Sequence, residues 1–350
     1  MENTESRLYF ASDYMEGAHP AIMKKLMETN LEKTVGYGQD PYTEDAKEKI
    51  RKACNAPEAE VFLLVGGTQT NATVIDALLK SYQGVVAADT GHIATHESGA
   101  IEFGGHKVLT VPQKDGKISA QQIEKLVKDF YDDANYEHMV MPGMVYISQP
   151  TEYGTLYSRE ELAALSKVCR ENHLPLYVDG ARLAYALASP ENDVTLTDLA
   201  ELSDVFYIGG TKCGALFGEA VVIPQKGRIP HFFTIIKQHG ALLAKGRIAG
   251  IQFGELFTDG LYYKIGRREV AQAGKLRAAF EAKGIEFASP SPTNQLFPIL
   301  SKPQLDALRE KYSFSVQSLL PDGGAVVRFC TSWASKESDV DALIADIKNF

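Results

Sequence analysis

The stretch that decides the fold is residues 174–224, LPLYVDGARLAYALASPENDVTLTDLAELSDVFYIGGTKCGALFGEAVVIP. It contains three short apolar runs, at 174–180, 204–210 and 219–224, and turn residues bound each run. Such runs predict buried strands. Asp179 ends the first run, and Lys212 follows the second among small residues. Because ligands bind outside the carboxyl ends of parallel strands, we expect this acid and this amine on neighbouring strands at a ligand-binding edge.

The same pattern continues toward the N-terminus. Further apolar runs predict strands at 61–65, 84–89, 107–112 and 144–150. Helical patterns lie between them at 70–82, 118–131 and 158–173. Ser119 is a plausible N-cap of the second helix, and Ser158 with Glu161 forms a capping box for the third. Strands that alternate with helices predict an α/β fold with a mostly parallel sheet.

The pattern changes after about residue 225. Residues 229–280 look helical, strands are expected within 285–300, 316–320 and 325–333, and a last helix is expected over 336–350. This composition is typical of a small α+β domain. We therefore predict three parts: an N-terminal segment (1–20) that joins the small domain, a large domain (21–250) and a small C-terminal domain (251–350).

Composition excludes several classes of protein. The 350 residues carry 36 basic and 45 acidic side chains, a net charge of −9, which is unfavourable for binding nucleic acid or an anionic membrane. No apolar run reaches the ~18 residues that span a bilayer. The first residues show no signal-peptide pattern, so we expect a cytoplasmic protein. The four cysteines form no Cys-x-x-Cys pair. His92 and His96 have helical zinc spacing, but no Glu lies between them and no third ligand follows, so we expect no metal site.

A third chemical group follows the strand at 61–65. Gly66 and Gly67 open a helix, and helix N-termini favour phosphate. The turn has neither the Walker ending nor the dinucleotide-binding glycine spacing. A phosphate cradle, the Asp179 carboxylate and the Lys212 amine together suit pyridoxal phosphate (PLP), which needs a partner for its phosphate, its pyridine nitrogen and its aldehyde.

Seven stretches then carry a family resemblance: 10–22, 35–50, 63–79, 92–108, 176–187, 207–222 and 326–333. In this order, along nearly the whole chain, they resemble the threonine aldolase and β-eliminating lyase group of fold-type I PLP enzymes. The resemblance implies an aspartate aminotransferase-like large domain beside the small domain. It also implies a homodimer or homotetramer with sites at the subunit interface, and an amino-acid substrate.

The resemblance implies roles for individual residues. Those implied to hold the cofactor are Gly67, Thr68 and Gln69 at the phosphate, Asp179 at the ring nitrogen, Lys212 at the aldehyde, His92 stacked on the ring and Arg182 nearby. Those implied to contact the substrate are Ser12, Arg182 and Arg328 at its carboxylate, with Tyr37 reaching in from the neighbouring subunit. Lys245 is implied to reach a phosphate across the dimer. For Arg328, the competing interpretation is an ion pair with a core Asp or Glu.

Three departures from the family pattern concern the reaction. His96 stands where the family usually has Tyr or Phe, Glu152 replaces a histidine, and Gly-Gly-Thr-Lys (209–212) replaces Ser-Phe-Ser-Lys. The implied activity is cleavage of the Cα–Cβ bond of β-hydroxy amino acids, with L-threonine or L-allo-threonine giving glycine and acetaldehyde. The alternatives are β-elimination, transamination or a non-catalytic relative. His92, His96, Glu152 and a phosphate-bound water all stay open as the base.

Overall fold

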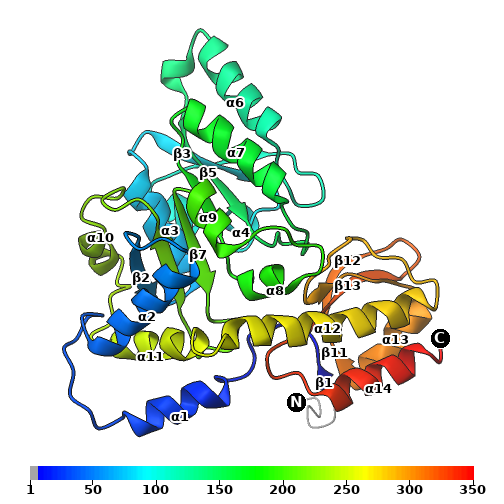
Figure 1. Ribbon diagram of the computed structural model, residues 1–350. Coiled ribbons are helices and arrows are strands. Elements are labelled where there is room, and N and C mark those ends of the chain that lie inside the picture. The colour runs from blue at the N-terminus through cyan, green and yellow to red at the C-terminus, as the bar shows by residue number, and fades with distance from the viewer. Residues whose placement is uncertain (1–6) are drawn as a thin grey trace.

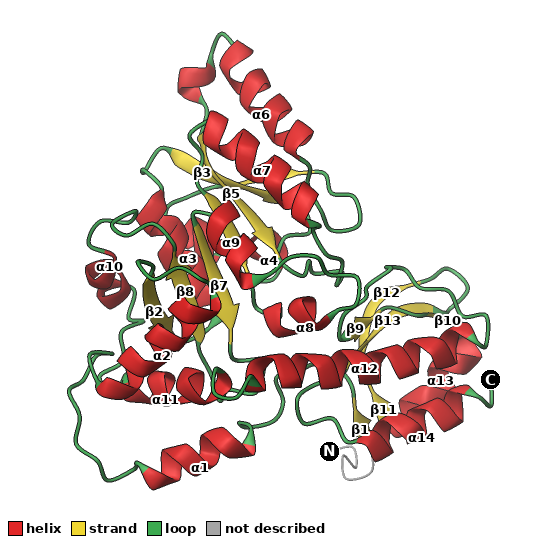
Figure 2. Cartoon of the chain, in the orientation of Figure 1, coloured by secondary structure: helices red, strands yellow, loops and turns green. Residues whose placement is uncertain are grey.

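The computed structural model describes residues 7–350, so the first six residues of the predicted N-terminal segment lie outside it. Its centre is a seven-stranded sheet in the order β2-β8-β7-β6-β5-β3-β4. The strands are β2 (Glu60–Leu64), β3 (Gln83–Ala88), β4 (Val108–Val111), β5 (Met141–Ser148), β6 (Leu176–Asp179), β7 (Val205–Gly209) and β8 (Glu219–Ile223). Six of these strands run in the same direction, and β8 runs opposite to them. The predicted α/β class with a mostly parallel sheet is confirmed (Figure 2).

Helices cover both faces of the sheet (Figure 1). One face packs against α3 (Gly67–Leu78), α4 (His92–Thr95), α5 (Ala100–Phe103) and α10 (Phe232–Gln238). The other packs against α2 (Pro41–Ala53), α6 (Ala120–Asp132), α7 (Arg159–Glu171), α8 (Leu183–Ala188), α9 (Leu196–Leu202) and α11 (Arg247–Leu256). Because side chains alternate along a strand, Tyr177 enters the first core and Val178 the second. Both faces are therefore buried, which explains the continuous apolar runs in the sequence.

The C-terminal third forms a second, smaller unit. Its strands are β9 (Gln295–Leu296), β10 (Ile299–Leu300), β11 (Tyr312–Ser313), β12 (Ser315–Leu319) and β13 (Ala325–Cys330), and its helices are α12 (Leu261–Glu281), α13 (Lys302–Lys311) and α14 (Glu337–Ile347). The N-terminal strand β1 (Leu8–Tyr9) pairs in parallel with β11, and Phe10 packs into the same core. The two ends of the described chain thus meet in this unit (Figure 1).

Two hydrophobic cores meet within α12. Tyr262, Ile265 and Val270 pack with the large core, whereas Leu276 and Phe280 pack with the small one. We therefore place the physical division inside this helix, near residue 271. The limits of 20 and 250 that the sequence suggests stay predictions.

Seven of the described α-helices lie where the sequence analysis predicted none: α4, α5, α8 and α9, which are short, and α1 (Pro20–Glu28), α2 and α13. The last three share one feature. Each has a proline in its first turn, namely Pro20, Pro41 and Pro303. Proline suits that position, because its fixed φ is helical and its missing N–H would have no helical partner there. A proline at these points was therefore an available signal for a helix start.

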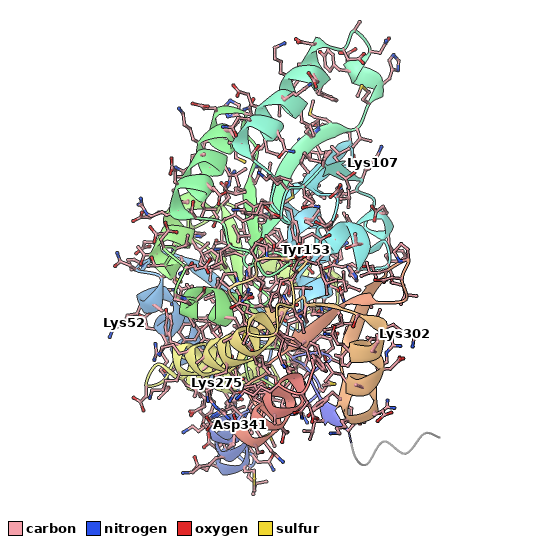
Figure 3. All side chains as sticks on the ribbon, turned by 90° about the vertical axis from the view of Figure 1, so that its right-hand side faces the viewer. Lys52, Lys107, Tyr153, Lys275, Lys302 and Asp341 are labelled. Atoms are coloured by element: carbon pink, nitrogen blue, oxygen red, sulfur yellow. The ribbon has the colours of Figure 1, made fainter. Side chains whose placement is uncertain are left out.

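Labelled charged side chains such as Lys52, Lys107 and Asp341 lie at the outside of the molecule, while side chains fill the space between the elements at its centre (Figure 3). Tyr153, labelled near the middle of that view, lies where the two units touch, because its ring contacts Phe297 and its carbonyl accepts a hydrogen bond from Ser289. None of the helices in residues 7–350 is both long and apolar enough to cross a membrane.

Candidate active site

The carboxyl ends of the parallel strands bring the predicted residues together. Gly67, His92, Asp179, Arg182 and Lys212 all line one cavity of about 40 Å³ at this edge of the large sheet. All five stand at the end of a strand or within four residues after one. The sheet topology therefore places side chains that are far apart in the sequence around a single small space.

Asp179 is held as a buried carboxylate. It is 5% exposed and accepts four hydrogen bonds. Oδ1 accepts from the Tyr207 hydroxyl and the Ala181 amide, while Oδ2 accepts from the Tyr146 hydroxyl and from Nδ2 of Asn71. Burial acts to raise the pKa of Asp179, but its interactions with His92 and with the Tyr207 and Tyr146 hydroxyls outweigh burial and lower that pKa. An ionised acid is thus available to a protonated ring nitrogen.

The sequence analysis missed the tyrosines that surround this acid. Tyr146, Tyr177 and Tyr207 are fully buried on three adjacent strands and face α3. The Tyr177 hydroxyl donates to Oδ1 of Asn71 at 2.8 Å, which fixes the orientation of the amide that contacts Asp179. The sequence did contain a signal for them, because each of three apolar runs includes one tyrosine. A tyrosine hydroxyl buried within a strand needs a polar partner, which here is Asp179 or Asn71.

Lys212 follows two glycines that pack too closely for any side chain. A Cβ at Gly209 would lie 2.3 Å from the Ala181 carbonyl oxygen, and one at Gly210 would lie 2.7 Å from that of Gly218. Burial and the positive charge of Arg182 lower the pKa of the Lys212 amine, although Asp13, Glu219 and Asp179 act in the opposite direction. A lowered pKa increases the fraction of neutral amine, the form that attacks a carbonyl.

The N-terminus of α3 is built to receive an anion. Its N-cap is Gly66, which supplies no capping side chain, and a Cβ there would meet nothing within 4 Å. Gly67 lines the cavity and Thr68 is exposed. Gln69 donates to the His239 carbonyl, while its buried Oε1 has no hydrogen-bond partner among the described residues. The free amides and the helix dipole therefore favour a phosphate at this point.

His92 is oriented from two directions. Its Nδ1 lies 2.7 Å from Oε1 of Glu97, whose side chain is completely buried, and its main-chain N–H donates to Glu152. Its ring stacks on that of His96, with 5.8 Å between the centroids. Because a carboxylate only accepts, Nδ1 of His92 carries the proton and Nε2 is left free for another partner. Neither Glu97 nor its second partner, Asn71, was predicted as a site residue.

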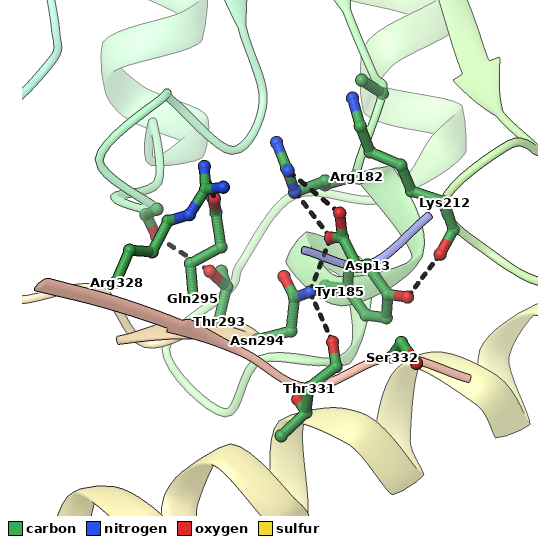
Figure 4. A network of polar contacts seen from close by, with 12 residues as sticks. Asp13, Arg182, Tyr185, Lys212, Thr293, Asn294, Gln295, Arg328, Thr331 and Ser332 are labelled. Carbon is green, nitrogen blue, oxygen red and sulfur yellow. Dashed lines mark hydrogen bonds and ion pairs between the residues drawn. The ribbon is translucent and has the colours of Figure 1, made fainter. Parts of the chain in front are cut away.

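Arg182 is already paired in this structure. Its Nε and Nη2 donate to the two oxygens of Asp13 at 2.7 and 3.0 Å, and Asn294 donates to the same carboxylate (Figure 4). Asp13 is fully buried, and the charge of Arg182 lowers its pKa despite burial. Asp13 therefore joins the N-terminal segment to both units. The implied contact of Arg182 with a substrate carboxylate stays a prediction.

Arg328, unlike Arg182, is not paired with a carboxylate of the described chain. Its guanidinium contacts only neutral oxygens, those of Gln295, Ala11 and Ser315, and its buried Nε has no partner within the described chain. No carboxylate of residues 7–350 lies within ion-pair distance of it. The core ion pair considered for this arginine is thus not found there. Ser12, the residue after Ala11, is buried.

Tyr37 and Lys245 do not line the cavity of their own chain. Both are exposed, and the Tyr37 N–H donates to the carbonyl of Ala244 at 3.2 Å, so the two segments lie side by side. The Tyr37 ring lies 4.5 Å from the Lys237 ammonium. Their implied reach into another subunit stays a prediction.

The remaining candidate bases differ in their contacts. Oε1 of Glu152 accepts from the Ser148 hydroxyl and from the His92 amide. Nδ1 of His96 lies 2.6 Å from the Thr95 hydroxyl, and burial with the charges of His92 and Arg328 lowers the pKa of His96. Among residues 7–350, no three His, Cys, Asp or Glu side chains are grouped so that they could hold a metal ion.

The residues present fit PLP. The uncapped α3 suits its phosphate, the ionised Asp179 suits its ring nitrogen, and the Lys212 amine suits its aldehyde. The buried Nε of Arg328, without a partner in the described chain, suits the carboxylate of an amino-acid substrate.

Comparisons with known proteins agree with this geometry. Residues 9–302 match the family model described as β-eliminating lyase. A low-specificity L-threonine aldolase from a Pseudomonas species is 33% identical over 349 residues, covering 99% of this chain and 98% of its own. A low-specificity L-threonine aldolase from Saccharomyces cerevisiae is 24% identical over 302 residues, covering 85% and 76%.

Two solved structures complete the comparison. The Leishmania major threonine aldolase superposes with a TM-score of 0.94 at 43% identity, covering 97% of this chain and 98% of its own. A Thermus thermophilus aspartate aminotransferase mutant reaches 0.73 at 15% identity, covering 98% and 91%, and confirms the predicted aminotransferase-like fold. The chain therefore belongs to the β-eliminating lyase family, whose enzymes depend on PLP.

Proposed function

We propose that this protein cleaves the Cα–Cβ bond of β-hydroxy amino acids, converting L-threonine or L-allo-threonine to glycine and acetaldehyde with low specificity. The observation that carries the proposal is one cavity in which the Lys212 amine, the Asp179 carboxylate and the uncapped end of α3 meet. The threonine aldolases named above, similar over nearly the whole chain, support the choice of substrate.

Each residue has a physical task in this reaction. Bound PLP supplies an electron sink for the pair released at Cα. Asp179 keeps a proton on the ring nitrogen, and Lys212 holds the cofactor by its aldehyde. Arg328 binds the substrate carboxylate through charge-assisted hydrogen bonds.

The base that removes the β-hydroxyl proton is, in this proposal, an imidazole. Nε2 of His92 and Nε2 of His96 make no hydrogen bond within residues 7–350, whereas Oε1 of Glu152 already accepts two. The lowered pKa of His96 favours the neutral ring, the form that a base requires.

Product analysis tests the activity. Purified protein supplied with PLP and L-threonine should release glycine and acetaldehyde in equal amounts, and L-allo-threonine should give the same products. Release of ammonia with a keto acid would instead establish β-elimination, whereas a keto acid formed without ammonia would establish transamination. A PLP-loaded protein that converts no amino acid would support the non-catalytic alternative.

Replacement of Arg328 by Lys should raise the KM for the amino acid by about tenfold or more, because a point charge replaces a planar fork worth ~1.5–3 kcal/mol in charged hydrogen bonds. PLP content and fold should be retained, since this side chain faces the substrate. Steady-state kinetics beside PLP occupancy measures both. Arg277→Lys is the matched control, because Arg277 is also half-buried and bonded to a carbonyl, that of Ser291. Loss of PLP with an unchanged KM would make Arg328 structural.

We also propose a homodimer or homotetramer that works in the cytoplasm. Beside Tyr37, the segment from α1 onward exposes apolar side chains: Met27 is 76% exposed, Leu31 91% and Val35 63%. In Figure 1 this segment stands at the edge of the molecule. Exposed apolar side chains gathered on one segment favour burial against a second subunit. A monomer that keeps full activity on dilution would contradict this assembly.

A further inference from the structure

Glu219 occupies a place that the sheet topology makes unusual. Because β8 alone runs antiparallel in the large sheet, its first residue lies at the edge where the parallel strands end (Figure 2). Glu219 pairs with Leu64 of β2 on one side and with Gly209 of β7 on the other. It therefore lies between the turn that opens α3 and the loop that carries Lys212.

The Glu219 side chain holds the two residues that precede Lys212. Its Oε1 accepts from the Thr211 hydroxyl at 2.8 Å, and its Oε2 accepts from the Gly210 N–H at 3.1 Å. The Thr211 hydroxyl in turn accepts from the Gly218 N–H at 3.0 Å. Glu219 is 3% exposed, so water does not compete for these bonds.

This loop needs such a restraint. Glycine loses more conformational freedom on folding than any other residue, and two glycines precede Thr211. The loop must nevertheless direct one long, flexible side chain into a cavity of about 40 Å³. A carboxyl group that binds both Gly210 and Thr211 fixes the direction in which the chain leaves β7.

We propose that Glu219 is a positioning residue for Lys212, acting through Gly210 and Thr211. The inference rests on the proposed function, which assigns Lys212 to the cofactor. Two independent features support it. The strand register places Glu219 at the edge of the sheet where the parallel strands end, and the Glu219 carboxyl accepts hydrogen bonds from Gly210 and Thr211, which precede Lys212.

Glu219 also acts on Lys212 electrostatically. Burial raises the pKa of Glu219 to about 8, against the opposing effects of the Thr211 hydroxyl and the Lys212 charge. At pH 7 the side chain is thus largely protonated, so one of its oxygens carries a proton that it can donate to the Thr211 hydroxyl, and the NH₂ group of glutamine can make the same contact. Above pH 8 it ionises, and its negative charge then raises the pKa of Lys212, which also faces Arg182, Asp13 and Asp179.

The test is capture of PLP by the protein freed of cofactor. The neutral Lys212 amine condenses with the aldehyde and one water leaves, and borohydride reduces the carbon–nitrogen double bond so that peptide mapping identifies the lysine. At pH 7, Glu219→Ala should slow capture by about tenfold to a hundredfold, the equivalent of two ordinary hydrogen bonds. Glu219→Gln should stay close to the parent rate.

The pH dependence separates positioning from simple packing. At pH 9 the Gln variant should capture PLP faster than the parent, because it lacks the negative charge that keeps Lys212 protonated. Glu269→Gln is the matched control: Glu269 is also fully buried with a pKa raised to about 8, but it lies on α12 and makes no hydrogen bond to residues 209–212. It should leave the rate unchanged at both pH values.

The outcomes are distinct. Parent-like capture by Glu219→Ala at Lys212 overturns the positioning role and leaves the proposed function intact. A label on another lysine in the parent protein overturns the proposed function itself. If the Ala variant does not fold, Thr211→Val decides: it removes one of the two contacts, and an unchanged capture rate would overturn the proposal.

Discussion

Replacement of Lys212 by Ala should reduce turnover of L-threonine by about a thousandfold or more, as removal of a residue that acts as part of a catalytic unit does. The reason is chemical: no other predicted residue places an amine in the cavity that contains Asp179. The protein should keep its fold, because Nζ of Lys212 makes no hydrogen bond or ion pair within the described residues and lies 5.9 Å from the centre of the Tyr14 ring. Turnover of L-threonine measures the loss of activity, the absorbance of lysine-bound PLP measures the loss of cofactor attachment, and thermal unfolding measures retention of the fold.

A lysine outside the cavity provides the control. Lys49 is half-buried and bonds to the Gly254 carbonyl and the Thr258 hydroxyl, so Lys49→Ala removes a comparable side chain without touching the site. It should retain activity. A PLP adduct that borohydride fixes to another lysine in Lys212→Ala would show that the assignment is wrong.

Replacement of Asp179 by Asn should lower kcat by about a hundredfold or more, equivalent to ~2.7 kcal/mol of transition-state stabilisation. A neutral amide cannot keep a proton on the ring nitrogen as a carboxylate can. The amide also fits poorly, because its NH₂ must face either the Asn71 amide or the Ala181 N–H, and both are donors. Some PLP should still bind, since the phosphate and aldehyde contacts are unchanged.

Tyr146→Phe is the informative comparison for this variant. It removes one of the four hydrogen bonds to Asp179 and leaves the negative charge in place. Its kcat should fall far less than that of Asp179→Asn if the charge is what matters. A near-normal kcat in Asp179→Asn, with PLP bound, would contradict the role that we assign to the Asp179 carboxylate.

Local sequence determined the strands and the residues at their ends. Apolar runs bounded by glycine or proline form strands because both faces of a parallel sheet are buried. Since parallel strands end at one edge, Asp179, Lys212 and the Gly66-Gly67 turn had to lie near one another once the strands were recognised. That reasoning required only periodicity and chain order, and the resemblance supplied the roles of His92 and Arg328.

Only the tertiary structure decided which partners these groups take. Asp13 lies 169 residues from Arg182, and Asn71 lies 108 residues from Asp179, yet each pair is joined by hydrogen bonds. Glu219 reaches the catalytic edge because its strand runs antiparallel, which no pattern of apolar residues reveals. A hydrogen bond depends on tenths of an ångström and on direction. Sequence periodicity determines which face of a strand a residue occupies, whereas the packing of whole elements against one another determines which distant atom lies within reach.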